Sequence, residues 1–356
     1  MSGEARVALT PVACKNLIEA GHSLYMQNDA GLISGYSDQD YQRHGVLLVE
    51  SAEQLYSTAQ LIVKVKQPLD QDIRYLRSDH ILFCYLHLAA DPGLIQTLCD
   101  IGLTAIPFES VTDETGHLPL LSPMSQVAGR IAAMRGASLL FRNRGGRGVL
   151  LGGVDGADSG KVVVLGAGVA GSHAVAVAAA LGAHVDVLDL DESRLKELKK
   201  LHPSIKTHLS TEALIASLCV SADLVIGAVL LAGRRAPVIL KQSVVKTMNP
   251  GSVIVDIAID QGGCVEDIRS TSSDELCYIK NGVIHSAVPN MPAAVARTSS
   301  QSLSSAISPY VKALADDAGN SVLQQALFRA RAIHRGEVVD AVLKQELSAD
   351  ETVSMA

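Results

Sequence analysis

One stretch, residues 161–191, constrains the fold of this chain more than any other; it reads KVVVLGAGVAGSHAVAVAAALGAHVDVLDLD. The apolar, β-branched run Val162–Leu165 is typical of a buried parallel strand. A G-x-G-x-x-G motif follows at Gly166–Gly171, an alanine-rich segment predicts a helix as far as Leu181, and the run Val185–Leu188 predicts another strand. Strand, glycine turn, helix and strand in this order predict the start of a dinucleotide-binding domain.

Each glycine of the motif has its own role in such a turn. Gly166 permits the tight turn out of the strand, Gly168 lets the backbone approach a pyrophosphate, and Gly171 lets the helix pack closely against the sheet. The free N–H groups at the N-terminus of the helix favour phosphate. Asp189 follows the second strand, about 20 residues beyond the turn, where an acidic side chain binds the adenosine ribose. Because a carboxylate there would repel a 2′-phosphate, the sequence predicts NAD rather than NADP.

Length and composition narrow the class of protein. A chain of 356 residues can hold two domains. Its formal net charge of −7 argues against nucleic acid as the main partner. Although the mean hydropathy is +0.24, no apolar run reaches the roughly 18 residues of a membrane span, and the N-terminus has no apolar signal region. We therefore expect a cytoplasmic protein that does not bind membranes.

The six cysteines are scattered and form no C-x-x-C pair, so the sequence predicts neither disulfides nor a metal site. Buried, reduced thiols are the expected state.

Short apolar runs alternate with amphipathic stretches before the glycine motif, which predicts a parallel sheet with helices on both faces. Expected strands include Arg6–Leu9, Leu61–Lys66, Ile81–Leu86 and Thr104–Ile106. A helix over 125–140 is expected to cross between domains; further strands are expected at 222–230, 252–260 and 282–288, and helices from Pro292 onward.

The sequence therefore predicts an α/β protein with two Rossmann-like domains, the nucleotide domain inserted into the substrate domain. The expected parts are a first substrate part over 1–127, an NAD-binding domain over 128–291, and helices over 292–356 that return to the substrate domain.

Three candidate catalytic residues, Lys66, His87 and Asp260, stand where expected apolar strands end, at the edge where parallel sheets bind ligands. Arg6 and Lys66 are candidates to bind an anion, although lysines at strand ends are more often solvated. His87 suits proton transfer near neutral pH, and a purely structural histidine is the alternative. Asp256 and Asp260 are expected on one face of an apolar strand, where a carboxylate is costly unless it is paired or used. Of these two, Asp260 is the better site candidate.

The loop that begins at Asn290 follows another expected strand. It either lines the nicotinamide pocket or has only a structural role.

Nine motifs follow one another along nearly the whole chain: RVALTP (from Arg6), KVKQP (from Lys64), LHLAAD (from Leu86), LPLLSPMSQVAGR (from Leu118), GGRGVLLGGV (from Gly145), GAGVAG (from Gly166), ADLVIGAVL (from Ala222), VDIAIDQGGC (from Val255) and NMPAAVARTS (from Asn290). Together and in this order, they resemble the alanine dehydrogenase family. The transhydrogenase α subunits share the architecture, but the motifs from Val255 and from Asn290 look more like alanine dehydrogenase.

The resemblance implies NAD-dependent oxidative deamination of L-alanine to pyruvate and ammonia by a homo-oligomer, a hexamer in this family. Arg6 and Lys66 would hold the substrate carboxylate, His87 would be the acid/base, and Asp260 the catalytic aspartate beside the nicotinamide. The further positions that would contact the cofactor are Ser125, Gly166, Gly168, Val169, Ala170, Gly171, Asp189, Arg194, Ser210, Val229, Leu230, Ile257, Asp260, Arg269, Val288, Asn290 and Met291.

Three departures from the family pattern accompany the resemblance. Family members carry additional residues before the RVALTP motif that form a first strand, which is not expected here and leaves Arg6 near a chain end where fraying is the default. Gln126 replaces a glutamate, residues 270–280 differ from the family's Thr/Pro-rich loop, and Ser286 stands where an aromatic residue is common. A non-catalytic NAD-binding paralogue and a related amino-acid or opine dehydrogenase therefore stand as alternatives.

Overall fold

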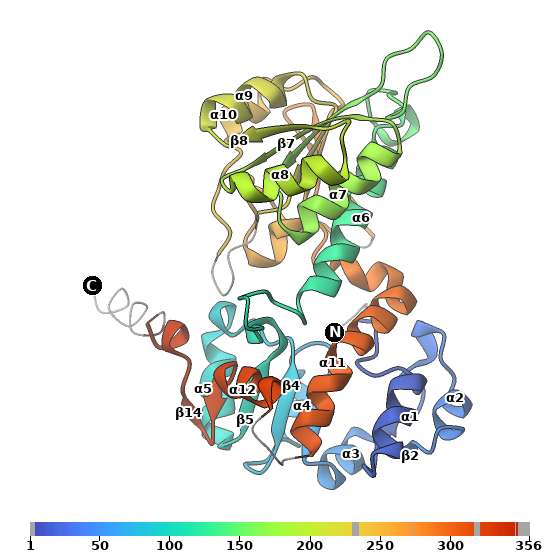
Figure 1. Cartoon of the computed structure of the whole chain (residues 1–356), viewed down its shortest axis with the longest axis vertical. Coiled ribbons are helices and arrows are strands. Elements are labelled where there is room, and N and C mark those ends of the chain that lie inside the picture. Colours follow the sequence, from blue (N-terminus) through green and yellow to red (C-terminus); the bar gives the residue numbers. More distant parts are fainter. Residues whose placement is uncertain (1–3, 230–234, 273, 317–320, 346, 348–356) are drawn as a thin grey trace. The chain divides into compact units, whose positions relative to one another are not determined.

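The structure is a computed structural model that describes residues 4–229, 235–272, 274–316, 321–345 and 347 (Figure 1). Contacts divide the chain into two domains. We call residues 1–124 with 293–356 the discontinuous domain, and residues 125–292 the inserted domain. The expected first boundary, after residue 127, and the observed one both fall within helix α6 (Ser122–Leu139).

The inserted domain is built on a seven-stranded sheet of order β11-β12-β10-β9-β6-β7-β8. All neighbouring strands are parallel except β11, which pairs antiparallel with β12. Strands β9 and β7 flank β6 on opposite sides, so the order of the strands reverses at β6. The strands are β6 (Lys161–Leu165), β7 (His184–Asp189), β8 (Lys206–Leu209), β9 (Leu224–Gly227), β10 (Val253–Asp256), β11 (Tyr278–Lys280) and β12 (Val283–Ser286).

Helices cover both faces of this sheet, as the apolar strands require. Val162 and Val164 of β6 belong to a core that includes residues of α6, α7 and α8, whereas Val163 and Leu165 face a second core that includes residues of α9 and α10. The helices are α7 (Val169–Ala180), α8 (Glu192–Leu201), α9 (Glu212–Val220) and α10 (Gln242–Val245), with the 3₁₀ turns η4 (Arg142–Arg144), η5 (Ile257–Gln261) and η6 (Met291–Val295).

The discontinuous domain has a five-stranded sheet of order β14-β13-β5-β4-β3. Strands β3 (Leu61–Val63), β4 (Ile81–Cys84) and β5 (Thr104–Pro107) are parallel, as the sequence predicts. The hairpin of β13 (Ile333–His334) and β14 (Glu337–Val338) adds an antiparallel edge. This edge was not predicted, because the C-terminal segment has a mainly helical pattern. A separate parallel pair joins β1 (Tyr25–Gln27) and β2 (Leu47–Val49).

Two cores also lie on the faces of this second sheet. Phe83 and Ile106 pack with residues of α11 and α12, and Leu82 and Ala105 pack with residues of α3 and α5. The helices are α1 (Pro11–Glu19), α2 (Asp38–Gln42), α3 (Ala52–Thr58), α4 (Asp70–Ile73), α5 (Pro92–Ile101), α11 (Ala296–Ala315) and α12 (Val322–Arg329), with the 3₁₀ turns η1 (Leu32–Ser34), η2 (Leu88–Ala90) and η3 (Phe108–Ser110).

The segment that carries Arg6 is not the strand expected over residues 6–9. Its N–H groups bond to side chains of α11: Val7 donates to Ser300 Oγ at 3.0 Å, and Thr10 donates to Ser304 Oγ at 2.9 Å. Helix α11 belongs to the C-terminal part of the same domain. Serine hydroxyl groups of α11 therefore hold the backbone on the C-terminal side of Arg6 in place of strand pairing.

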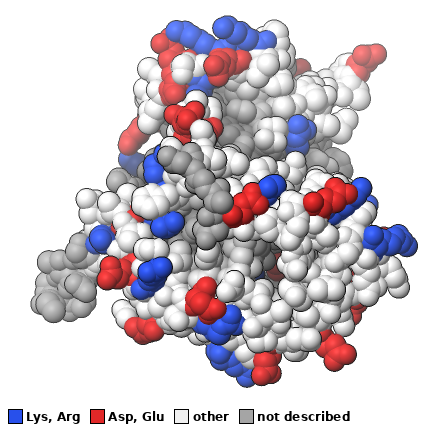
Figure 2. Space-filling model, turned by 60° about the horizontal axis from the view of Figure 1, so that its bottom comes forward, with Lys and Arg blue, Asp and Glu red and all other residues white. Residues whose placement is uncertain are grey.

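Within the described residues, no helix combines the length and apolar character needed to cross a membrane. On the face shown in Figure 2, lysine and arginine side chains lie among aspartates and glutamates and form no single basic field.

Candidate active site

Three side chains of the discontinuous domain come from the carboxyl ends of adjacent parallel strands. Lys66 follows β3, His87 follows β4, and Glu109 lies in η3 directly after β5. Because these strands are neighbours and point the same way, their carboxyl ends meet at one edge of the sheet. The edge therefore gathers an ammonium, an imidazole and a carboxylate.

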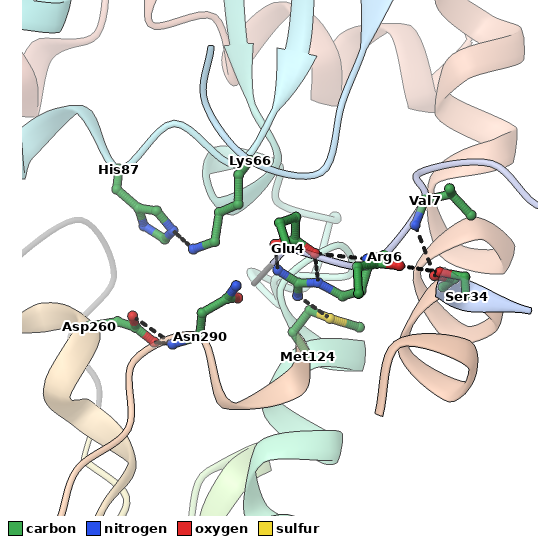
Figure 3. Close-up of polar contacts among 11 residues, drawn as sticks. Glu4, Arg6, Val7, Ser34, Lys66, His87, Met124, Asp260 and Asn290 are labelled. Atoms are coloured by element: carbon green, nitrogen blue, oxygen red, sulfur yellow. Dashed lines mark hydrogen bonds and ion pairs between the residues drawn. The ribbon is translucent and has the colours of Figure 1, made fainter. Parts of the chain in front are cut away.

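His87 contacts both of these neighbours. Its Nε2 lies 3.2 Å from Lys66 Nζ (Figure 3), and its Nδ1 lies 3.9 Å from Glu109 Oε1. Since an ammonium can only donate, Nε2 is the acceptor and the ring proton is on Nδ1. Burial lowers the pKa of His87 to about 3, with help from the charges of Lys66 and Arg6. The imidazole is thus neutral, with a basic nitrogen directed at a cation.

Glu109 holds the backbone around His87. The N–H of Leu86 donates to its Oε1 at 3.1 Å, and the N–H of His87 donates to the same oxygen at 2.5 Å. His87 has φ +50°, a left-handed conformation that non-glycine residues rarely adopt. Burial raises the pKa of Glu109, while these N–H groups oppose the rise. Glu109 therefore fixes the direction in which the imidazole leaves the strand.

Arg6 is buried, with 7% of its surface exposed. Its guanidinium donates to both carboxylate oxygens of Glu4, at 2.8 and 2.6 Å, and to Met124 Sδ at 3.2 Å (Figure 3). Its charge reaches His87, whose pKa it helps to lower. The structure thus brings Arg6, Lys66 and His87 into one electrostatic group, and Glu4 demonstrates that Arg6 can bind a carboxylate in two-point geometry.

The glycine motif of the inserted domain has the geometry of a phosphate-binding turn. Gly166 has φ +102°, and a Cβ on Gly171 would lie 1.8 Å from the carbonyl oxygen of Gly166, so only glycine fits there. A Cβ on Gly168 would meet no atom within 4 Å. Gly168 precedes the first residue of α7, so open space lies beside the N-terminus of a helix, where an anion is favoured.

The expected cofactor positions gather at the carboxyl edge of the same sheet. Asp189 ends β7, and its Oδ2 accepts the N–H of Ala167 in the glycine turn at 2.6 Å. Ser210, after β8, donates its N–H to the carbonyl of Asp189 at 2.8 Å. Val229, Ile257 and Val288 follow β9, β10 and β12, and Met291 is buried in the core.

Ser125 approaches this edge from α6. It lies one helical turn before Gly129, on the same face. A Cβ on Gly129 would lie 2.0 Å from the carbonyl oxygen of Ala170, so α6 touches the glycine motif at this point.

Asp260 is not on the strand expected over 252–260. Strand β10 ends at Asp256, because the Asp256 carboxylate accepts the N–H of Ala258 at 2.9 Å and turns the chain into η5. Asp260 lies in η5 and accepts the N–H of Asn290 at 3.1 and 3.2 Å (Figure 3). The two aspartates therefore do not share a strand face: Asp256 is buried, and Asp260 is exposed beside the Asn290 loop.

The two remaining arginines among the expected cofactor residues form ion pairs with nearby carboxylates of the inserted domain. Arg194, on α8, pairs with Asp191 at 3.4 Å. Arg269 pairs with Glu275 at 2.8 Å and lies over the ring of Tyr278. Leu230 lies outside the described residues.

Sequence reasoning missed Glu4 and Glu109, and it ranked Asp256 below Asp260. Glu109 carries a detectable signal, because it follows the apolar strand TAIPF just as Lys66 and His87 follow theirs. Glu4 has no signal of its own apart from being two residues before Arg6.

Comparison with known proteins identifies the family. Residues 1–128 match the family described as "Alanine dehydrogenase/PNT, N-terminal domain", and residues 132–341 match its C-terminal counterpart. The chain belongs to the alanine dehydrogenase/PNT family. It is 46% identical over 327 residues to an alanine dehydrogenase of Bacillus subtilis, covering 89% of this chain and 86% of that protein. An alanine dehydrogenase of Mycolicibacterium smegmatis is 42% identical, with 97% and 94% covered.

Solved structures agree with the family assignment. An L-alanine dehydrogenase has a TM-score of 0.92 and 43% identity, with 98% of this chain and 96% of that chain covered. A transhydrogenase from Sinorhizobium meliloti has a TM-score of 0.81 and 26% identity, with 96% of each covered. The α/β class and the two Rossmann-like domains predicted from the sequence are thereby confirmed, as is the predicted family.

Proposed function

We propose that this chain catalyses the reversible, NAD-dependent oxidative deamination of L-alanine to pyruvate and ammonia. The observation that carries the proposal is the group of Arg6, Lys66 and His87 in a chain 41–46% identical to proteins named alanine dehydrogenase. The 26% identity to a transhydrogenase makes that activity the weaker candidate.

Arg6 and Lys66 are proposed to bind the substrate carboxylate. Both cations act on His87, and we propose that the substrate carboxylate replaces that of Glu4 on Arg6 and pairs with Lys66 as well. The Arg6 guanidinium already holds one carboxylate, that of Glu4, through two nitrogens. Fixing the carboxylate at two points would orient Cα, and orientation contributes strongly to such reactions.

His87 is proposed as the acid/base. Its unprotonated Nε2 accepts a proton from water as the water adds to the carbon of iminopyruvate, and returns the proton to the nitrogen that leaves as ammonia. Burial is the main cause of the low pKa of His87, and the charges of Lys66 and Arg6 lower it further, so a substrate carboxylate bound to these cations would raise that pKa.

Asp260 is proposed to act on the cationic form of the substrate amine or imine. A carboxylate favours such a cation electrostatically. The N–H of Asn290 donates to the Asp260 carboxylate and holds it in place. Asp260 lies in η5, which follows the parallel strand β10 of the inserted domain.

Two features of the inserted domain suit the binding of NAD. The space beside Gly168 and the N–H groups that begin α7 suit a pyrophosphate, and Asp189 suits the ribose. When bound, NAD⁺ accepts the hydride from Cα. The remaining positions proposed to contact it are those that the family resemblance implies, with Ser125, Ser210, Val229 and Asn290 among them.

A substrate panel tests the proposal. NADH formation is followed by its absorbance with L-alanine and NAD⁺, beside L-serine, L-glutamate and NADP⁺. Turnover with L-alanine and NAD⁺ is the expected result. Turnover of a larger amino acid instead would favour an opine-type dehydrogenase, and NADH binding without turnover would favour a non-catalytic paralogue.

We also propose a cytoplasmic homo-oligomer, a hexamer by family resemblance. Native mass spectrometry of the full chain tests this; a monomer at micromolar concentration would contradict it.

A further inference from the structure

A buried carboxylate stands at the base of the loop that carries Asp260. Asp256 is the last residue of β10 and is 0% exposed. One oxygen accepts the N–H of Ala258 at 2.9 Å, and the other accepts those of Cys264 at 2.8 Å and Val265 at 3.1 Å. The Cys264 thiol adds a longer contact at 3.5 Å. Burial raises the pKa of this carboxyl group, so its ionised form costs energy that these donors offset.

The donors come from the two ends of a single loop. Ala258 is near its start, and Cys264 and Val265 are at its close, so one side chain clamps the loop across residues 257–264. Asp260 lies between these anchor points, in η5. A shift of the loop would therefore move Asp260 directly.

The loop is shaped to fit this carboxylate. Gly263 has φ +81°, and a Cβ there would lie 3.0 Å from Asp256 Oδ2 and 2.4 Å from Ile268 Cγ2. An apolar residue at 256 would leave three buried N–H groups without an acceptor. Asp256 therefore does more than fill space in the core.

We propose that Asp256 is a positioning residue for Asp260: it fixes the loop of residues 257–264 and thereby the position of the Asp260 carboxylate. This rests on the role given to Asp260 in the proposed function. Because a displacement of a reactive group by about 1 Å can cost about 10²-fold in rate, disturbing the clamp should lower kcat more than it weakens cofactor binding.

The test is a double-mutant cycle in the full-length protein. Asp256→Asn replaces an acceptor oxygen by a donor, with nearly unchanged volume, and is measured alone and with Asp260→Asn. Ile254→Ala is the matched control, since Ile254 is a buried residue two positions earlier on β10 and on the same core face as Cys264. Each variant is characterised by kcat, the Kd for NADH and the melting temperature.

We expect Asp256→Asn to lower kcat at least tenfold and to weaken NADH binding by a smaller factor, because Ile257 and Asp260 are only two of the expected cofactor positions. In the Asp260→Asn background the same change should lower kcat less than twofold further. Ile254→Ala should lose comparable thermal stability and keep kcat within twofold. Gly263→Ala, which crowds the clamp and keeps the carboxylate, should give the same pattern and serves if Asp256→Asn does not fold.

Two results would overturn the proposal in distinguishable ways. An inactive Asp260→Asn with an active Asp256→Asn, or fully additive losses, would refute the positioning role alone. A fully active Asp260→Asn would remove Asp260 from the proposed mechanism, and the role of Asp256 with it.

Discussion

Replacing Glu109 with alanine removes the acceptor for two backbone N–H groups, those of Leu86 and His87. A buried N–H left without a partner costs about 1–3 kcal/mol, so loss of both destabilises this corner of the domain by about 2–6 kcal/mol. Leu86 is only 1% exposed, which limits replacement of its acceptor by water. The left-handed backbone of His87 loses the contact that holds it.

Hydrogen exchange of the segment after β4 measures this directly. A loss of 2 kcal/mol in the free energy of local opening accelerates exchange about 30-fold, since 1.4 kcal/mol is about tenfold. Glu109→Gln keeps one oxygen acceptor and should fall between wild type and Glu109→Ala. Because Glu109→Ala removes the contact that orients His87, kcat should also fall in this variant, by about 100-fold if the imidazole shifts by about 1 Å.

Asp79→Ala is the control. Asp79 is an exposed carboxylate that pairs with Arg77 at 2.9 Å before β4 begins, and such pairs contribute about 0–1 kcal/mol. Unchanged exchange at Leu86 and His87 in Glu109→Ala would refute the reasoning.

The remaining predictions concern the cofactor turn and the titration of His87. Gly171→Ala should abolish NADH binding or folding, because its Cβ would lie 1.8 Å from a backbone oxygen, whereas Gly168→Ala should fold and bind NADH more weakly in a fluorescence titration; equal binding by both would contradict this. Asp189→Ala should narrow the preference for NAD⁺ over NADP⁺ in kcat/KM, and an unchanged ratio would remove Asp189 from that role. The pKa of His87 is about 3 in the folded chain and about 6.5 when unfolded, so the unfolded state takes up the proton first and stability falls as the pH drops from about 6.5 toward 3. His87→Gln should flatten that decline by up to about 1.4 kcal/mol per pH unit in denaturant unfolding, and an identical slope would argue against a depressed pKa.

Much of the fold follows from sequence patterns because the strands are continuous apolar runs. The runs around Leu82 and Val163 are fully buried on both sides, which only a sheet covered by helices allows. The geometry of the glycine turn can also be predicted from the sequence, because the close approach of Gly171 to the carbonyl oxygen of Gly166 joins residues only five positions apart.

Other features depend on contacts between distant residues and could not be read from a local pattern. The segment at Arg6 looks like a strand, but serines of α11, nearly 300 positions away, satisfy its N–H groups. The apolar run through Asp256 looks like one long strand, but the buried carboxylate bends it into η5. Lys66 and His87 were predicted singly from strand ends; their 3.2 Å contact needed the strand order.

The most direct test of the account compares His87→Ala with the wild-type chain in steady-state NADH formation from L-alanine and NAD⁺, with NADH binding measured on both proteins. General acid/base catalysis contributes about 10²- to 10⁴-fold, so kcat should fall within that range while the Kd for NADH stays within threefold of wild type. Near-normal turnover in His87→Ala would contradict the central claim that the residues at this strand edge carry out the reaction.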